Sequence, residues 1–392
     1  MDTIENLIPQ LHNPFSVVEK ENENVLLIIE VDKIQRVYLY CDSQVLHIIE
    51  YIDGKNSISK IQDNLKQDKG IDISVDVLND IIFNKLKKVT SDEIHIKPKN
   101  SYLLLKITLI KSKYVEVISK YLSFIFKNKN FVIISFIFNI IFCLGFLYSG
   151  VHNFKLDSQK IYILPLTMAI TLLLHEFGHA ISCRSYGAKH GDIGFGFYLL
   201  TPVLFADVTD VWKLSRKERV IVDIAGMYME SLLVLCLILL YILTNNPLFY
   251  YCSSVIVFNT LVNINPFLRF DGYWILSDIT NTYNLRAKAN EQLYNFISLK
   301  DVKINARKGF LIVYGLLCNL FLLWFLYYVS RYMFVDLFKF PLNIYYYVKN
   351  WFWQSENHIT FWQISLPMAF YFVVFSQLKS LSRYIKLKLK KE

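Results

Sequence analysis

The sequence predicts a mainly α-helical, polytopic membrane protein with a small α+β domain of winged-helix type at its N-terminus. Two observations support this fold class. Hydrophobic residues make up 54% of the 392 residues, including 30 Phe and 26 Tyr, which is too apolar for an ordinary soluble protein of this length. Long apolar runs lie in residues 131–392, whereas residues 1–100 alternate charged and apolar side chains.

Residues 1–100 have the length and pattern of a separate cytosolic domain. Strand-like runs at 24–31 and 36–41 are followed by three helix-like stretches at 44–52, 60–67 and 75–89. Serine or aspartate residues that can cap a helix precede each stretch. Two strands and three short helices therefore predict a small α+β domain.

Residues 101–130 are expected to form an amphipathic helix that lies in the membrane surface. Apolar residues such as Tyr114, Ile118 and Tyr121 recur at helical spacing, while lysines such as Lys113 and Lys120 occupy the other face. A basic amphipathic pattern of this kind is typical of interfacial helices.

Residues 131–392 contain about six apolar segments that are long enough to cross a bilayer. They span residues 131–150, 162–183, 220–243, 249–268, 310–334 and 361–378. A further apolar stretch, 193–211, is interrupted by glycines and Pro202, which predicts a re-entrant hairpin.

The positive charges predict the orientation of these segments. On this assignment 25 Lys and Arg residues flank one side of the membrane and five the other, so both termini of this multi-pass cell-membrane protein are expected in the cytosol. Topology thus explains the net charge of +9, and since the chain has no nucleic-acid motif, we expect no nucleic-acid partner. The first residues lack a basic region followed by an apolar run, so no secretory signal peptide is expected.

The second apolar segment carries a zinc-hydrolase motif, His175-Glu176-Phe177-Gly178-His179. On a helix His175 and His179 lie one turn apart on the same face, where both imidazoles can bind one metal ion. Glu176 lies beside them and can take a proton from a water molecule. The fourteen residues before His175 carry no charge. Ionisable groups are costly in such a segment, which favours a functional role for the cluster.

A catalytic zinc ion usually has three protein ligands, so the motif needs one more. Asp271 is the best placed, because the second and fourth segments both enter from the outer side and Asp271 follows the cytosolic end of the fourth. Glu230, in the third segment, is an alternative ligand. Cys183 is a weaker alternative, since it lies one helical turn beyond His179 and too far from a metal held between the two histidines.

These motifs resemble the site-2 protease family of intramembrane zinc metalloproteases, and specifically its bacterial branch of peptide zinc metalloproteases. The resemblance covers residues 160–280 and includes the run Asn-Pro-x-x-x-x-Asp-Gly that ends at Gly272. It implies a site-2 protease core with one zinc ion per chain, bound by His175, His179 and Asp271. It also implies that Glu176 is the catalytic residue, and it assigns no other cofactor.

Three further residues are predicted near the substrate or the ligands. Many family members have Gly-Pro-x-x-Asn in the third core helix, whereas this chain has Glu230 in place of the asparagine, so Glu230 is expected to orient the substrate or support the ligands. Asn263 and Asn265 are candidates to hydrogen-bond the substrate or the ligands, although each can also serve as a helix-end amide.

Residues 1–100 resemble the PqqD-like domains that grip leader peptides of ribosomally made products. The resemblance implies that a peptide is held as an added edge strand. We therefore expect a peptidase that cuts a membrane-associated or leader-bearing peptide during maturation or export. A non-proteolytic peptide-binding or immunity protein on the same fold is the alternative. The expected partners are a peptide substrate and the lipid bilayer, with a peptide exporter as a further candidate.

Overall fold

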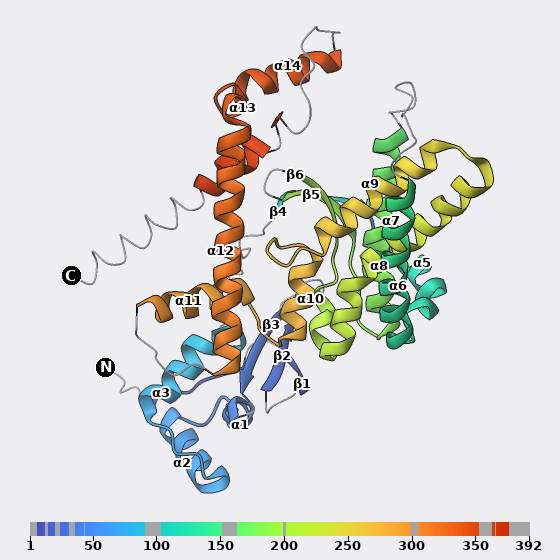
Figure 1. Ribbon diagram of the computed structural model, residues 1–392. Coiled ribbons are helices and arrows are strands. Elements are labelled where there is room, and N and C mark those ends of the chain that lie inside the picture. The colour runs from blue at the N-terminus through green and yellow to red at the C-terminus, as the bar shows by residue number, and fades with distance from the viewer. Residues whose placement is uncertain are drawn as a thin grey trace. The chain divides into compact units, whose positions relative to one another are not determined.

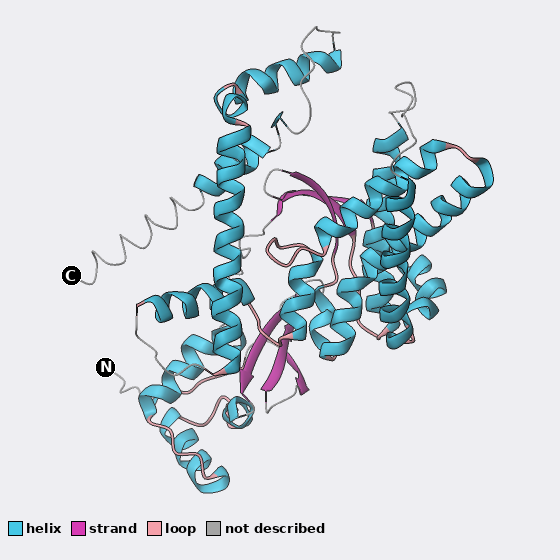
Figure 2. Ribbon diagram, in the orientation of Figure 1, coloured by secondary structure: helices cyan, strands magenta, loops and turns pink. Residues whose placement is uncertain are grey.

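The computed structural model describes residues 6–11, 15–19, 24–30, 36–42, 44–90, 103–150, 163–198, 201–298, 305–352, 363–364 and 366–375. Helices dominate these residues, together with two small sheets (Figure 2). Contacts divide the chain into two compact units. The first contains Met1–Ser101 with Trp212–Ser215, and the second contains Tyr102–Val211 with Arg216–Glu392.

The first unit contains an antiparallel sheet followed by short helices. Its strands, in the order β1-β2-β3, are β1 (Phe15–Glu19), β2 (Asn24–Glu30) and β3 (Arg36–Asp42). Its helices are α1 (Gln44–Glu50), α2 (Ile58–Lys69), α3 (Val75–Asn79), a π-helical stretch (Asp80–Lys85) and α4 (Lys87–Thr90). The prediction of two strands missed β1, and the predicted single helix over 75–89 is divided into three parts. The proposed role of this unit as a peptide-binding domain stays a prediction.

Alternation along β2 builds the core of the first unit. Leu27 and Ile29 point the same way, as residues two apart on a strand do, and are buried with Ile49 of α1. Helix α2 begins after Ser57, whose side chain accepts a hydrogen bond from the Lys60 backbone N–H.

The second unit opens with a strand where the sequence predicted a helix. The predicted interfacial helix over 101–130 is wrong for its first part, because Leu103–Ile110 forms strand β4. These residues lack the helical spacing that starts at Tyr114, and they pair with β5 (Ile193–Tyr198). The helical part is α5 (Ser112–Leu122), followed by a 3₁₀ turn. The side chains of Tyr114, Val117 and Tyr121 on α5 are exposed.

Four helices in the described part of the chain are long and apolar enough to cross a membrane, which indicates a membrane protein. They are α6 (Lys129–Gly150), α7 (Ile163–Ser185), α8 (Arg216–Thr244) and α12 (Ala306–Tyr332), coloured from green to orange in Figure 1. They correspond to the first, second, third and fifth predicted segments.

The other two predicted spans differ from the expected segments. The fourth forms α9 (Pro247–Asn263), which has 17 residues and stops before Asn265, because the residue before Pro266 is disfavoured in a helix. Of the sixth, only the apolar stretch Leu366–Phe375 is described as a helix. Six spans therefore stay a prediction. The orientation of the termini also stays a prediction, and residues 1–5 and 376–392 lie outside the described residues.

Short helices follow α9. They are α10 (Asp271–Ile279), α11 (Leu285–Ile297), α13 (Phe334–Phe338) and α14 (Phe340–Phe352). Between α7 and α8, β5 and β6 (Thr201–Ala206) pair as a hairpin within the stretch 193–211, and the sheet order is β4-β5-β6. Re-entry of this hairpin into a membrane stays a prediction.

Helices α7 and α8 pack closely at the centre of the second unit. An added Cβ at Gly178 would lie 2.5 Å from the carbonyl oxygen of Ala225, so only glycine allows this approach of the two backbones. Apolar side chains of both helices, including Ile181 and Met227, are buried in the same core cluster. This contact sets where the polar residues of α7 and α8 meet.

Candidate metal centre

Three residues from two separate helices bring metal-binding atoms together. His175 and His179 lie on α7, and Asp271 is the first residue of α10. One ligand atom from each lies within 4.8 Å of the others, so the group could hold a metal ion. The two histidine Nε2 atoms are 3.0 Å apart, and Asp271 Oδ2 is 2.9 Å from Nε2 of His175. The structure thus brings together the three predicted ligands.

The hydrogen-bond partner of His179 determines which of its nitrogens faces the other ligands. Its Nδ1 lies 2.7 Å from the carbonyl oxygen of Val222 on α8. A carbonyl oxygen only accepts hydrogen bonds, so Nδ1 carries the proton and donates it. In the neutral ring, Nε2 therefore presents a lone pair toward His175 and Asp271.

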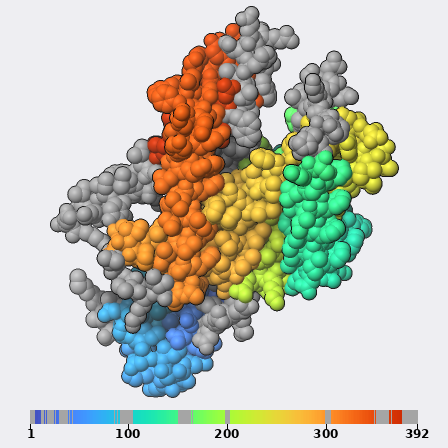
Figure 3. Space-filling view, viewed as in Figure 1, coloured from blue at the N-terminus to red at the C-terminus, as the bar shows by residue number. Residues whose placement is uncertain are grey.

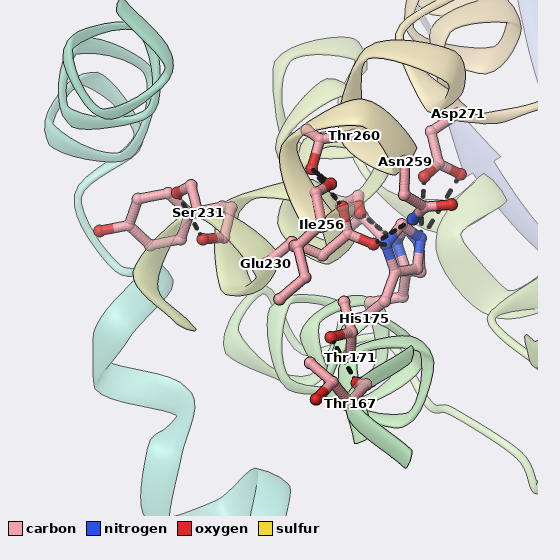
Figure 4. A network of polar contacts seen from close by, with 12 residues as sticks. Thr167, Thr171, His175, Glu230, Ser231, Ile256, Asn259, Thr260 and Asp271 are labelled. Carbon is pink, nitrogen blue, oxygen red and sulfur yellow. Dashed lines mark hydrogen bonds and ion pairs between the residues drawn. The ribbon is translucent and has the colours of Figure 1, made fainter. Parts of the chain in front are cut away.

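Glu230 determines which nitrogen of His175 faces the other ligands. Glu230 is fully buried on α8, and its Oε1 lies 3.0 Å from Nδ1 of His175. The carboxylate also accepts hydrogen bonds from the Asn259 amide at 2.9 Å and the Thr260 hydroxyl at 2.6 Å. Figure 4 shows Asn259 and Thr260 of α9 beside the Glu230 carboxylate of α8, which in turn contacts the His175 ring. As an acceptor, Glu230 directs the Nδ1 proton toward itself and the Nε2 lone pair toward Asp271.

The lone pairs of His175 Nε2, His179 Nε2 and Asp271 Oδ2 therefore face one another, and none of these three atoms carries a proton. Asp271 Oδ2 is buried and has no hydrogen-bond partner. Asp271 also lies in the first turn of α10, where the helix dipole favours negative charge. Such an arrangement is stable when a cation lies between the three atoms, so the donor set fits a metal ion.

Glu176 lies near the end of strand β6. The residue is 8% exposed, and its carboxylate lies close to the backbone N–H of Ala206, the last residue of β6. Because Glu176 follows His175 directly on α7, the carboxylate is fixed next to the ligand group. Within the described sheet, β6 is an edge strand.

Gly226 leaves the space that His175 occupies. An added Cβ at this position on α8 would lie 2.5 Å from Nε2 of His175 and 2.6 Å from two carbons of the same ring. The helix backbone therefore passes directly beside the metal-facing nitrogen. A side chain at this position would displace the atom that has to bind the metal.

We expect Gly226→Ala to weaken zinc binding on the order of 10- to 100-fold, because the methyl group displaces the His175 ring. Alanine favours a helix interior by about 1 kcal/mol over glycine, so the fold should be retained. Isothermal titration with zinc measures the change, and Gly145→Ala on α6, with open space around its Cβ, is the control. Equal zinc affinity in both variants would show that Gly226 does not limit the His175 position.

The remaining predicted residues have different surroundings. The Asn265 side chain accepts a hydrogen bond from the Phe267 backbone N–H at 2.8 Å and so shapes the loop after α9. Asn263 is the last residue of α9 and is partly buried. The Cys183 thiol donates to the carbonyl of Lys189 and does not join the ligand group.

Sequence reasoning missed Asn259 and Thr260. The available signal was an amide followed by a hydroxyl in the middle of an otherwise apolar segment, the place where polar groups need partners. That signal indicates that Asn259 and Thr260 have hydrogen-bond partners, but it does not show which residues these are. The contact with Glu230 depends on how α8 and α9 pack.

Comparison with known proteins gives one distant relative. The chain is similar to a curated protein of Bacillus subtilis (strain 168) described as "Putative peptide zinc metalloprotease protein YydH", with 26% identity over 236 residues. The aligned part is 59% of this chain and 83% of that protein. No family model matches the chain, and no solved structure matches it.

Proposed function

We propose that this protein is a membrane-embedded zinc endopeptidase of the site-2 protease type. The observation that carries the proposal is the arrangement of two lone-pair nitrogens and a carboxylate around one point, with Glu176 fixed beside them. A protein that only bound peptides would need no buried carboxylate at this position. The name of the distant relative supports the same chemistry.

The spacing of the ligand atoms suits zinc. Tetrahedral zinc with bonds of about 2.0–2.1 Å holds its ligand atoms roughly 3.3 Å apart. In the structure the two Nε2 atoms are 3.0 Å apart, Nε2 of His175 is 2.9 Å from Asp271 Oδ2, and Nε2 of His179 is 3.7 Å from Asp271 Oδ1, which brackets that value. Two imidazoles and one carboxylate are also a typical ligand set for catalytic zinc, which leaves one position for water or substrate.

When bound, zinc supplies Lewis acidity toward a peptide carbonyl and a water molecule. Glu176 accepts a proton from the attacking water, whose oxygen bonds to the carbonyl carbon. As the C–N bond breaks, Glu176 delivers that proton to the leaving nitrogen. Glu230 keeps the His175 ring in the tautomer that exposes Nε2.

Strand β6 is the element that presents the substrate in this proposal. It is an edge strand of the described sheet, and it ends at Ala206, which lies close to the Glu176 carboxylate. An extended peptide paired with β6 would have its main chain next to the catalytic carboxylate. A substrate helix has to unwind before it can bind in this way, because its carbonyls are otherwise hydrogen-bonded internally.

The first unit recruits the substrate in this proposal. Its sheet has edge strands that can accept a leader peptide as an additional strand. Holding the leader raises the local concentration of the attached peptide at the metal centre. The substrate is therefore a leader-bearing or membrane-associated peptide, cut during its maturation or before export.

The test is hydrolysis of a ribosomally made precursor peptide by the full-length protein in detergent or vesicles, followed by mass spectrometry. We expect one main cleavage position, loss of cleavage after chelation of zinc, and recovery when zinc is added. The same peptide without its leader should need a higher concentration for the same rate. Cleavage that persists after complete removal of metal would contradict the proposed function. If both peptides reached the same rate at the same concentration, only the recruiting role of the first unit would be contradicted.

A further inference from the structure

The loop that ends at Asp271 is held by helices that follow it in the chain. Residues 264–270 connect α9 to α10, and two of their carbonyls accept hydrogen bonds from the next helices. The Tyr314 hydroxyl on α12 donates to the Pro266 carbonyl at 2.7 Å. Arg286 Nη1 on α11 donates to the Phe267 carbonyl at 3.2 Å. The loop conformation therefore depends on α11 and α12.

Aromatic packing adds to these hydrogen bonds. The Phe267 ring stacks on Tyr314 at 6.3 Å between centroids and on Phe321, also on α12, at 5.5 Å. Phe267 packs against the core cluster that joins α10, α11 and α12. In Figure 3 the orange atoms of α11 and α12 lie against the gold atoms of the α9–α10 region.

Helices α11 and α12 form a firm support for this loop. An added Cβ at Gly315 would lie 2.8 Å from the carbonyl oxygen of Ala289, so the two backbones are in close contact. The Asn319 amide on α12 donates to the Asn290 side chain on α11 at 3.2 Å. Because the two helices are packed so tightly, they present Tyr314 and Arg286 as one surface.

The link from this surface to the metal ligand is short. Phe267 precedes Asp271 by four residues, and Gly272 lies against the Ile264 carbonyl with no room for a side chain. The loop is thus compact, and a shift of its carbonyls is transmitted to Asp271. His175 and His179, in contrast, are placed by α7 and α8.

We infer that Tyr314 and Arg286 are positioning residues for the metal centre, acting through the loop that carries Asp271. The inference rests on the proposed function, in which Asp271 is a metal ligand. Metal sites need their ligands within about 0.5 Å of the productive geometry, so losing one restraint on the loop should change metal binding before it changes the fold.

The test uses cobalt as the probe with the full-length protein in detergent, because cobalt absorbs visible light according to its ligand geometry. Tyr314→Phe keeps the ring and removes only the hydroxyl. We expect cobalt to bind about three- to tenfold more weakly, the loss typical of one hydrogen bond, and the visible spectrum to change. Tyr327→Phe is the matched control, since Tyr327 lies on the same helix and is 63% exposed. A second variant, Arg286→Met, should change the spectrum in the same direction.

The outcomes separate this inference from the proposed function. Wild-type protein that takes up no cobalt or zinc would overturn both. Wild-type protein that binds cobalt, with the same affinity and spectrum in Tyr314→Phe and Arg286→Met, would overturn only the positioning role. Thermal melting of each variant shows whether the fold is intact. If Tyr314→Phe does not fold, Arg286→Met alone decides the result.

Discussion

Glu176→Gln is expected to lower the rate of peptide hydrolysis by about 10²- to 10⁴-fold while zinc stays bound, because the amide cannot take up the proton of the attacking water. The amide has nearly the volume of the carboxyl group, so it fits at the same place on α7. The metal ligands are other residues, so zinc content should not change. Mass spectrometry of the peptide products and metal analysis of the same sample measure both quantities.

Glu291→Gln is the control for this experiment, since Glu291 is an exposed residue of α11. Its activity and zinc content should equal those of the wild type. A parallel loss of zinc in Glu176→Gln would mean that Glu176 supports the site and does not carry protons. Unchanged hydrolysis in Glu176→Gln would assign the proton transfer to another group.

Asp271→Ala is expected to remove zinc from the purified protein. Two imidazoles remain, but a third ligand is needed to retain catalytic zinc, and both hydrolysis and metal content should fall to background. The fold should survive, because Asp271 lies at the first position of a short helix and its Oδ2 has no hydrogen-bond partner. Metal analysis after dialysis, together with a melting curve, checks both expectations.

Two further variants make this prediction specific. Asp72→Ala changes an exposed aspartate of the first unit and should retain zinc fully. Glu230→Gln should retain zinc with lower affinity, because the amide supports the His175 ring more weakly than a carboxylate. Stoichiometric zinc in Asp271→Ala, combined with its loss in Glu230→Gln, would make Glu230 the ligand in place of Asp271.

Local sequence patterns were enough to predict part of the site. His175, Glu176 and His179 lie within five residues on one helix, so helical geometry alone predicts how they are placed. Asp271 could be predicted because it follows the cytosolic end of the fourth predicted segment and lies in a run that resembles a known motif. The apolar runs likewise predicted α6, α7, α8 and α12, since length and composition are properties of each segment alone.

Features that depend on packing between segments could not be predicted. Gly226 matters because α8 lies against α7 in one particular register, which the sequence of α8 does not specify. The same register determines that Glu230 contacts Nδ1 of His175. Leu103–Ile110 forms a strand because it pairs with β5, a segment far away along the chain. The roles of Asn259 and Tyr314 arise from contacts with residues about 30 and 50 positions away.

The distribution of the ligands along the chain has a consequence for biosynthesis. Asp271 is made 96 residues after His175, and Tyr314 is made 43 residues after Asp271. At about 5–20 residues per second, a ribosome needs about 5–20 s to go from the first ligand to the last. During that time the nascent chain has two imidazoles and Glu176 but no complete ligand set. In the proposed function, hydrolysis therefore begins only after α7, α8, α9 and α10 have assembled.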